Sequence, residues 1–378
     1  DIDVDGTTNL DIVDIDGAAN FAADVTLANG ADLITASAGL SNVRFGVNAG
    51  NSIASGGNYN VVVGDEAGTA LTTGDGNVAV GFEALKTEDA NNANTAIGHQ
   101  ALKTLNAGAT GYNTAVGFTA GIAMTTALEN TLIGALAGDA ITTGNSNTAV
   151  GMSALSAATT GTLNVAIGKD ALRDNTTAGA NTAVGTVSMR LNTTGASNTA
   201  VGYGTLDTNT TGASNVAIGR DSLTANTTAS NNTAVGYASL SSNTTGAANT
   251  AVGYASLSAN TTGASNVALG TNALIANTTA NNNTAVGTSS LVANTTGASN
   301  VALGTNALGA NTTASNNTGL GFRALFVNTT GAQNTAIGTN ALFANTTAAN
   351  NTAVGYASLG ANTTGASNTA VGYAALDA

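Results

Sequence analysis

Two glutamates are the closest approach to a catalytic pair in this sequence. Glu66 and Glu83 stand one period of a 17-residue repeat apart, so stacked repeats would place their carboxylates about 5 Å from each other. Carboxylates at that separation can act together in a retaining glycosidase, and a stray cation site is a second possibility. Gln100 continues the row, however, and residue types there vary between repeats as on a solvated edge. We therefore expect exposed carboxylates and no enzymatic activity.

The other residue types that commonly carry chemistry are absent or isolated. The chain has no cysteine, and its one histidine, His99, has no cysteine or triad partner near it in the sequence. The start at Asp1 resembles half of an EF-hand calcium loop, but Ile12 stands where that loop requires glutamate. The alternation of Asp with Ile or Val there instead predicts a strand with glycine turns. We expect no metal and no cofactor.

Aromatic residues form an intermittent row directly after one glycine of the repeat. Rings presented at such an edge can stack on the faces of sugars, or they can pack on one another along the edge, which is the simpler interpretation. The row is the candidate glycan-contact site, and it consists of Phe82, Phe118, Tyr203, Tyr237, Tyr254, Phe322, Tyr356 and Tyr373.

These candidate residues are positioned by the repeat itself. The closing glycine of an Asn-Thr-Ala-Val-Gly run recurs every 17 residues from Gly134 to Gly372, and copies spaced 17 to 19 residues apart extend the series back to Gly46. Twenty copies with a nearly fixed period predict an all-β parallel solenoid, or β-roll, with one coil per repeat. At about 4.8 Å per coil, the stack would be roughly 95 Å long.

We number positions from this glycine, which is position 0. Position −1 is always bulky, position −3 is Val or Thr, and position +4 is usually Leu, so these three rows are the predicted core. We expect a strand over −4 to 0, a turn at +1 and +2, a short strand over +3 to +5, and then an Asn-Thr-Thr loop. Most charged residues of the repeats fall at +1, +2, +5 or +6, which indicates two solvated edges.

Two further rows indicate close packing. Position −2 is almost always Ala, so both faces of the strand should be covered, either by the other wall of a flat coil or by a second chain. The glycine at position 0 never varies, so it needs a positive φ or has no room for a Cβ atom. The predicted structural glycines include Gly151, Gly168, Gly185, Gly202, Gly219, Gly236, Gly253 and Gly270. Asparagines at −4 and +7 should form hydrogen-bonded ladders between coils.

Composition excludes several classes of function. Only 8% of residues are charged, and the net charge of −13 argues against binding to nucleic acid or to anionic membranes. No apolar run is long enough to span a bilayer. A hydrophobic fraction of 43% and fixed apolar positions argue against disorder. We divide the chain into an N-terminal β shaft segment, residues 1–41, and a repeat array, residues 42–378, and expect it to be a piece of a longer or processed protein.

The Asn-Thr-Ala-Val-Gly-x-x-Ala-Leu unit with its Asn-Thr-Thr-Gly spacer resembles the repeat region of phage tail-fibre proteins. It is also similar to the head repeats of trimeric autotransporter adhesins, which form trimeric parallel β-rolls. The acidic segment from Val4 to Gly17 looks like tail-fibre shaft sequence.

This resemblance implies a homotrimeric structural fibre of a virion or extracellular surface, supporting attachment to a host glycan or protein. A bacterial surface adhesin is one alternative. An ice-binding solenoid is another, although such proteins usually carry Thr-x-Thr motifs that are absent from the unit here.

Overall fold

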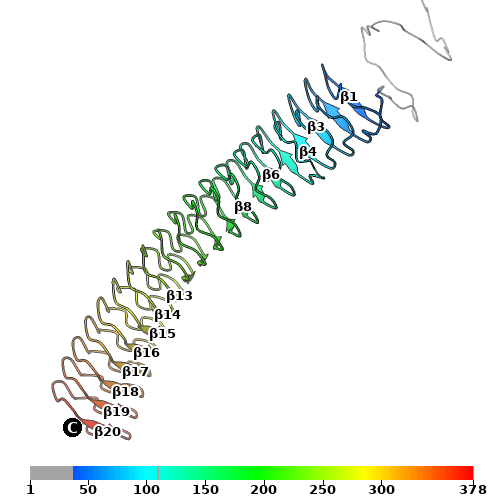
Figure 1. Cartoon of the computed structure of the whole chain (residues 1–378). Coiled ribbons are helices and arrows are strands. Elements are labelled where there is room, and N and C mark those ends of the chain that lie inside the picture. The colour runs from blue at the N-terminus through cyan, green and yellow to red at the C-terminus, as the bar shows by residue number, and fades with distance from the viewer. Residues whose placement is uncertain (1–36, 109, 378) are drawn as a thin grey trace, which may run out of the picture. The chain divides into compact units, whose positions relative to one another are not determined.

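The computed structural model describes residues 37–108 and 110–377, so most of the predicted N-terminal segment, including the acidic Asp1–Gly17 pattern, lies outside the described residues. The regular elements in the described part are strands of three residues, one per repeat (Figure 1). They are β1 (Val43–Phe45), β2 (Val61–Val63), β3 (Val78–Val80), β4 (Thr95–Ile97), β5 (Thr114–Val116), β6 (Thr131–Ile133), β7 (Thr148–Val150), β8 (Val165–Ile167), β9 (Thr182–Val184), β10 (Thr199–Val201), β11 (Val216–Ile218), β12 (Thr233–Val235), β13 (Thr250–Val252), β14 (Val267–Leu269), β15 (Thr284–Val286), β16 (Val301–Leu303), β17 (Thr318–Leu320), β18 (Thr335–Ile337), β19 (Thr352–Val354) and β20 (Thr369–Val371).

Each strand pairs in parallel with the strand of the next repeat, and equivalent positions face each other, as Ala251 faces Ala268. Backbone hydrogen bonds between coils continue outside the strands: Leu257 N donates to Ala273 O at 2.9 Å, and Thr261 N donates to Thr278 O at 2.8 Å. The predicted parallel β-solenoid with coils of about 17 residues is therefore confirmed.

The direction of the strand side chains differs from the prediction. The Ala row at −2 points into the coil and is buried, whereas the bulky rows at −1 and −3 point outward and stay partly exposed, as Ile97 (38%) and Ile218 (39%) show. The prediction of a core at −1 and −3 was wrong. The coil interior is narrow, and where the opposite wall places a leucine at +4, the residue across from it at −2 is small. Val62 and Leu132 are buried at −2 in two coils where +4 is glycine. The predicted core role of +4 is confirmed.

The segment after the glycine is a chain of turns, so the predicted short strand over +3 to +5 was also wrong. Its residues at +2 and +4 have positive φ, for example Ala255 at 50° and Leu257 at 52°. A left-handed conformation costs a non-glycine residue about 1–2 kcal/mol. Full burial of a leucine side chain contributes about 1.5–3 kcal/mol. Leucine therefore tolerates this backbone because the same conformation directs its side chain into the core.

Large residues at +7 compensate where +4 is glycine. A Cβ atom added at Gly68 would lie 2.8 Å from Leu71 Cδ1, and one added at Gly138 would lie 2.7 Å from Ile141 Cδ1. The +7 side chain thus occupies the space that a +4 leucine fills in other coils. The same pairing occurs between Gly50 and Ile53 and between Gly121 and Met124. The volume of each core layer is preserved although its residues change.

The predicted asparagine ladders are confirmed. In the −4 row, Asn266 Nδ2 donates to Asn249 Oδ1 at 3.1 Å, and in the +7 row Asn277 Nδ2 donates to Asn260 Oδ1 at 2.9 Å. Each +7 amide also closes its own turn, since Asn260 Nδ2 donates to Gly263 O at 2.9 Å. These buried amides are held between coils because burial without partners would be costly.

The glycine at position 0 is required for both predicted reasons. Gly253 has a φ of 135°, and a Cβ atom there would lie 2.6 Å from Gly270 O in the next coil. The other predicted structural glycines also have positive φ and equally close backbone neighbours; they are Gly151, Gly168, Gly185, Gly202, Gly219, Gly236 and Gly270. Position 0 is therefore where one coil lies directly against the next.

Substituting Gly81→Ala should destabilise its coil by about 3 kcal/mol or more, because φ is 130° and the new Cβ would lie 2.4 Å from Gly98 O. The matched control is Gly76→Ala, where φ is 65° and no atom lies within 4 Å; it should cost about 1 kcal/mol. Hydrogen exchange of the amides in these coils measures both effects. Equal losses of protection would contradict the steric explanation.

Candidate functional site

The eight aromatic residues of the predicted glycan-contact row all lie on the outside of the solenoid. Phe82 (42%) is the least exposed of them, and interior members such as Tyr254 reach 56%. Each follows directly after a position 0 glycine whose φ lies between 130° and 145°. The row is thus one edge of the stack, and every ring in it is accessible from the side.

The rings also stack on their neighbours along the fibre. His99 lies between Phe82 and Phe118, with ring centroids 5.3 and 5.1 Å apart. Tyr237 stacks on Tyr254 at 5.4 Å with an interplanar angle of 12°. Tyr356 and Tyr373 stack in the same way at 5.2 Å. In-register stacking produces these ladders because the same position recurs one strand spacing away.

A guanidinium group takes the place of a ring in one ladder. The Cζ atom of Arg220 lies 5.6 Å from the centroid of Tyr203 and 6.0 Å from that of Tyr237, within the range of cation–π attraction. The ladders therefore show the ring-on-neighbour packing that was the simpler interpretation. Contact with a sugar stays a prediction. Because neighbouring rings cover each other's faces, a sugar would have to contact the outer edges of the rings or the uncovered face at the end of a ladder.

The two glutamates of the possible catalytic pair are neutralised by lysines. Lys86 Nζ bridges them through ion pairs to Glu66 and, at 2.7 Å, to Glu83. Lys103 Nζ reaches the other oxygen of Glu83 at 2.6 Å, and Gln100 Nε2 donates to it at 2.8 Å. With both oxygens of Glu83 engaged, the cluster functions as a surface ion-pair network. Among the described residues no group of His, Cys, Asp and Glu side chains is arranged to hold a metal.

These ion pairs hold the pKa of Glu83 low, at about 2, chiefly through the Lys103 hydrogen bond and then through Lys86. Because folding lowers this pKa from 4.5, the stabilisation is present above pH 4.5 and is lost as pH falls towards 2. The substitution Glu83→Gln should lower the urea midpoint at pH 7, with a difference that shrinks on acidification and with added salt. A difference that is constant with pH would contradict this assignment.

A second carboxyl group, Glu88, is fully buried. It occupies the +7 row between Leu71 and Leu105, in the core. Its Oε1 atom accepts from the backbone amides of Asp89 and Asn91, both at 3.1 Å, whereas Oε2 has no hydrogen-bond partner. Burial raises the pKa of Glu88. Sequence inspection overlooked this residue, although a carboxylate in a row of leucine, methionine and asparagine was a usable signal.

Because its folded pKa is raised above 4.5, Glu88 contributes stability that is fully present below pH 4.5 and is lost as pH rises through the folded value. The substitution Glu88→Asn restores the residue type of the later coils and removes the charge. It should raise the free energy of unfolding at pH 7 by roughly 1–3 kcal/mol and have less effect at pH 4. Urea titrations at both pH values measure this, with Glu88→Gln as the length-matched control. No gain at pH 7 would contradict the assignment.

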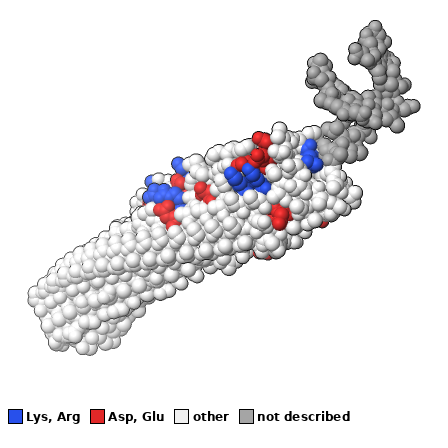
Figure 2. All heavy atoms as spheres, turned by 45° about the horizontal axis from the view of Figure 1, so that its top comes forward, with Lys and Arg blue, Asp and Glu red and all other residues white. Residues whose placement is uncertain are grey.

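The outward rows at −3 and −1 form the second candidate surface, an aliphatic face. Position −1 is Val, Ile or Leu in all strands except β1, where it is Phe45, and position −3 is Val or Thr throughout. Neither row contains a charged residue. Charged side chains lie outside these two rows. Figure 2 shows that, on the visible face, they gather in the half of the stack nearer to β1. From residue 222 to residue 376 the only charged residue is Arg323.

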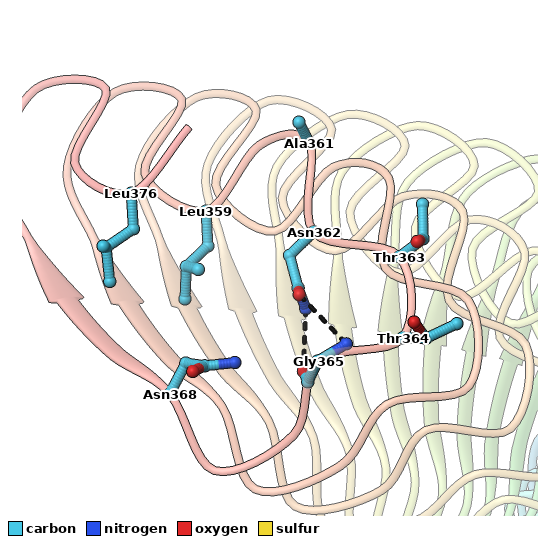
Figure 3. Close-up of a pocket in the computed structure, with 8 residues that line it drawn as sticks. All are labelled: Leu359, Ala361, Asn362, Thr363, Thr364, Gly365, Asn368 and Leu376. Atoms are coloured by element: carbon cyan, nitrogen blue, oxygen red, sulfur yellow. Dashed lines mark hydrogen bonds between the residues drawn. The ribbon is translucent and has the colours of Figure 1, made fainter. Parts of the chain in front are cut away.

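A hollow of about 350 Å³ lies at the last complete coil (Figure 3). Leu359 and Leu376 line it. Asn362 closes its turn through two hydrogen bonds: Asn362 Nδ2 donates to Gly365 O at 2.9 Å, and Gly365 N donates to Asn362 Oδ1 at 3.1 Å. The same rows line the interior of every earlier coil, where the next coil covers them. The hollow is the core seen from its end and adds no separate chemistry.

Comparison with protein families finds no matching family, and comparison with curated proteins finds no similar sequence. Within residues 37–108 and 110–377, no helix is long and apolar enough to cross a membrane. The outward aliphatic face and the aromatic edge are therefore the two features from which a function can be argued.

Proposed function

We propose that the chain is the rigid shaft of a homotrimeric viral tail fibre, which supports attachment to a host from the virion or another extracellular surface. The observation that carries this proposal is the outward aliphatic face, which continues through all twenty strands without a charge. Position −1 of this face is Val, Ile, Leu or Phe in every strand, whereas position −3 is threonine in thirteen of the twenty strands. A continuous row of large apolar side chains on the outside of a protein marks an interface. The shaft itself performs no chemistry.

The dimensions of the face support an obligate assembly. From the first strand to the last there are nineteen spacings of about 4.8 Å, which give a length of roughly 90 Å, and two rows of side chains give a width of roughly 10 Å. Each chain therefore offers about 900 Å², which is comparable to the roughly 800 Å² per partner of a stable interface. Three copies arranged about a threefold axis would cover this face along the whole fibre. Uninterrupted stacking would make the rod stiff because each coil is bonded to both neighbours.

The first test is the mass in solution. The wild-type chain should have three times the mass of one chain by light scattering, and negative-stain images should show rods. The double substitution Ile218→Lys and Val252→Lys places charges on the aliphatic face, two coils apart, and should produce monomers. The control Thr211→Lys and Thr245→Lys, on an exposed row of nearby coils, should remain trimeric. A monomeric wild type overturns the trimer, and a trimeric Ile218→Lys, Val252→Lys variant excludes this face.

A bacterial surface adhesin is the second candidate, and the aromatic ladders favour it. They are half-exposed along the side of the rod, so the array could contact a host glycan or matrix protein at several heights. The full reading frame separates the two candidates: a membrane anchor encoded beyond Ala378 would favour the adhesin, and a cleavable chaperone domain there would favour the fibre. The ice-binding alternative receives less support, because threonine at −3 is interrupted by valine in seven strands, β1, β2, β3, β8, β11, β14 and β16.

A further inference from the structure

Tyrosines stand directly next to each other at two places in the +1 aromatic row. Tyr237 and Tyr254 belong to adjacent coils, and their ring centroids lie 5.4 Å apart with an interplanar angle of 12°. Tyr356 and Tyr373 repeat this arrangement at 5.2 Å and 10°. Because both rings of a pair occupy the same repeat position in register, the carbons ortho to one hydroxyl group lie beside those of the other ring.

The other three tyrosines of the chain have no such neighbour. Arg220 separates Tyr203 from Tyr237, with its Cζ atom 5.6 and 6.0 Å from the two ring centroids. Tyr59 and Tyr112 lie outside the +1 row, in coils three repeats apart. All seven tyrosines are exposed to solvent. Accessibility therefore does not distinguish the two groups, and what sets the pairs apart is a second phenol within stacking distance.

We infer that the stacked pairs are modification sites at which a one-electron oxidant, such as a peroxidase with hydrogen peroxide, joins adjacent coils through dityrosine. Each phenol loses one electron and its hydroxyl proton, which gives a tyrosyl radical with spin density on its ortho carbons. Two radicals combine through a bond between these carbons. The proton on each bonded carbon then moves to the phenol oxygen, which restores both aromatic rings. Overall, two tyrosines and one hydrogen peroxide give one dityrosine and two waters.

The coil stacking holds the two reacting rings together before oxidation. Gly253 N donates to Val235 O at 2.8 Å, and Ala255 N donates to Tyr237 O at 3.0 Å, so the backbone is fixed on both sides of Tyr254. Positioning of this kind replaces a bimolecular encounter by a unimolecular step. The two rings are 45% and 56% exposed, which leaves them free to tilt towards each other by rotation about their side-chain bonds. Radicals of one pair therefore couple within the chain.

The cross-link adds a covalent bond where the fold otherwise relies on hydrogen bonds between coils. The chain has no cysteine, so no disulfide links its coils. A dityrosine between adjacent coils closes a loop of one repeat and restricts the unfolded chain, as a disulfide does. The inference goes beyond the proposed shaft function. It holds for a monomer and for a trimer, because both tyrosines of each pair belong to one chain.

The test is oxidation of the full chain with a peroxidase and hydrogen peroxide, followed by denaturation, digestion with trypsin and mass spectrometry. Tyr237 and Tyr254 are the only tyrosines of the tryptic peptide Asp221–Arg323. Coupling between them removes two hydrogen atoms from this peptide and produces dityrosine fluorescence. The three unpaired tyrosines lie in separate peptides and should show no such loss.

The substitution Tyr254→Phe should abolish the loss of two hydrogen atoms from this peptide, and Phe82 and Phe118 show that the +1 row accepts phenylalanine. The matched control is the double substitution Tyr254→Phe, Thr271→Tyr. It keeps two tyrosines in the same peptide but places them two coils apart, with a phenyl ring between them. Its cross-linking should be at least about tenfold lower than in the wild type. Circular dichroism spectra that match the wild type show that both variants are folded.

The inference is overturned if the wild-type peptide does not lose two hydrogen atoms on oxidation. It is also overturned if the double variant cross-links as efficiently as the wild type. Dityrosine that joins mainly separate chains, seen as covalent dimers on a denaturing gel, would contradict it as well.

Discussion

The fold depends on hydrogen bonding between the backbones of successive coils. The register of these bonds places each residue against the residue at the same repeat position in the next coil. This register places Asn249 on Asn266 and Gly253 against Gly270. Every row of the repeat therefore experiences self-interaction, and only side chains that tolerate it can recur. Asparagine amides can bond to one another, alanine and leucine pack, and aromatic rings stack. Like charges repel, which explains why charges are sparse and why Glu66 and Glu83 require intervening lysines.

The same register permits a backbone that would be too strained in an isolated turn. Non-glycine residues at +2 and +4 keep positive φ in coil after coil, and their cost is offset by leucine burial and by bonds to both neighbouring coils. Position 0 is the exception, because stacking there brings the next backbone into the space of a Cβ atom. A repeat of this kind accepts wide variation on its edges and almost none at this glycine.

Function is consequently confined to surfaces that stacking leaves free. The strand gives one of them, a charge-free aliphatic face that suits other copies of the chain. The turns give the other, where residue types change between coils and produce aromatic ladders and ion pairs. A spacer needs only the first surface. The second surface provides the variation from which recognition of another molecule can arise.

The sequence alone determined the period, the parallel stacking, the asparagine ladders and the role of the position 0 glycine, because each follows from one row repeating on itself. It also placed the aromatic row on an edge. Tertiary structure decided which strand face is inside. The large side chains at −1 suggested that this row faces the core. The interior is so narrow, however, that Leu257 leaves room only for the small side chain of Ala251 at −2. Tertiary structure also decided that Lys86 lies between Glu66 and Glu83, because that ion-pair cluster depends on the distance between coils and on residues from different rows of the repeat.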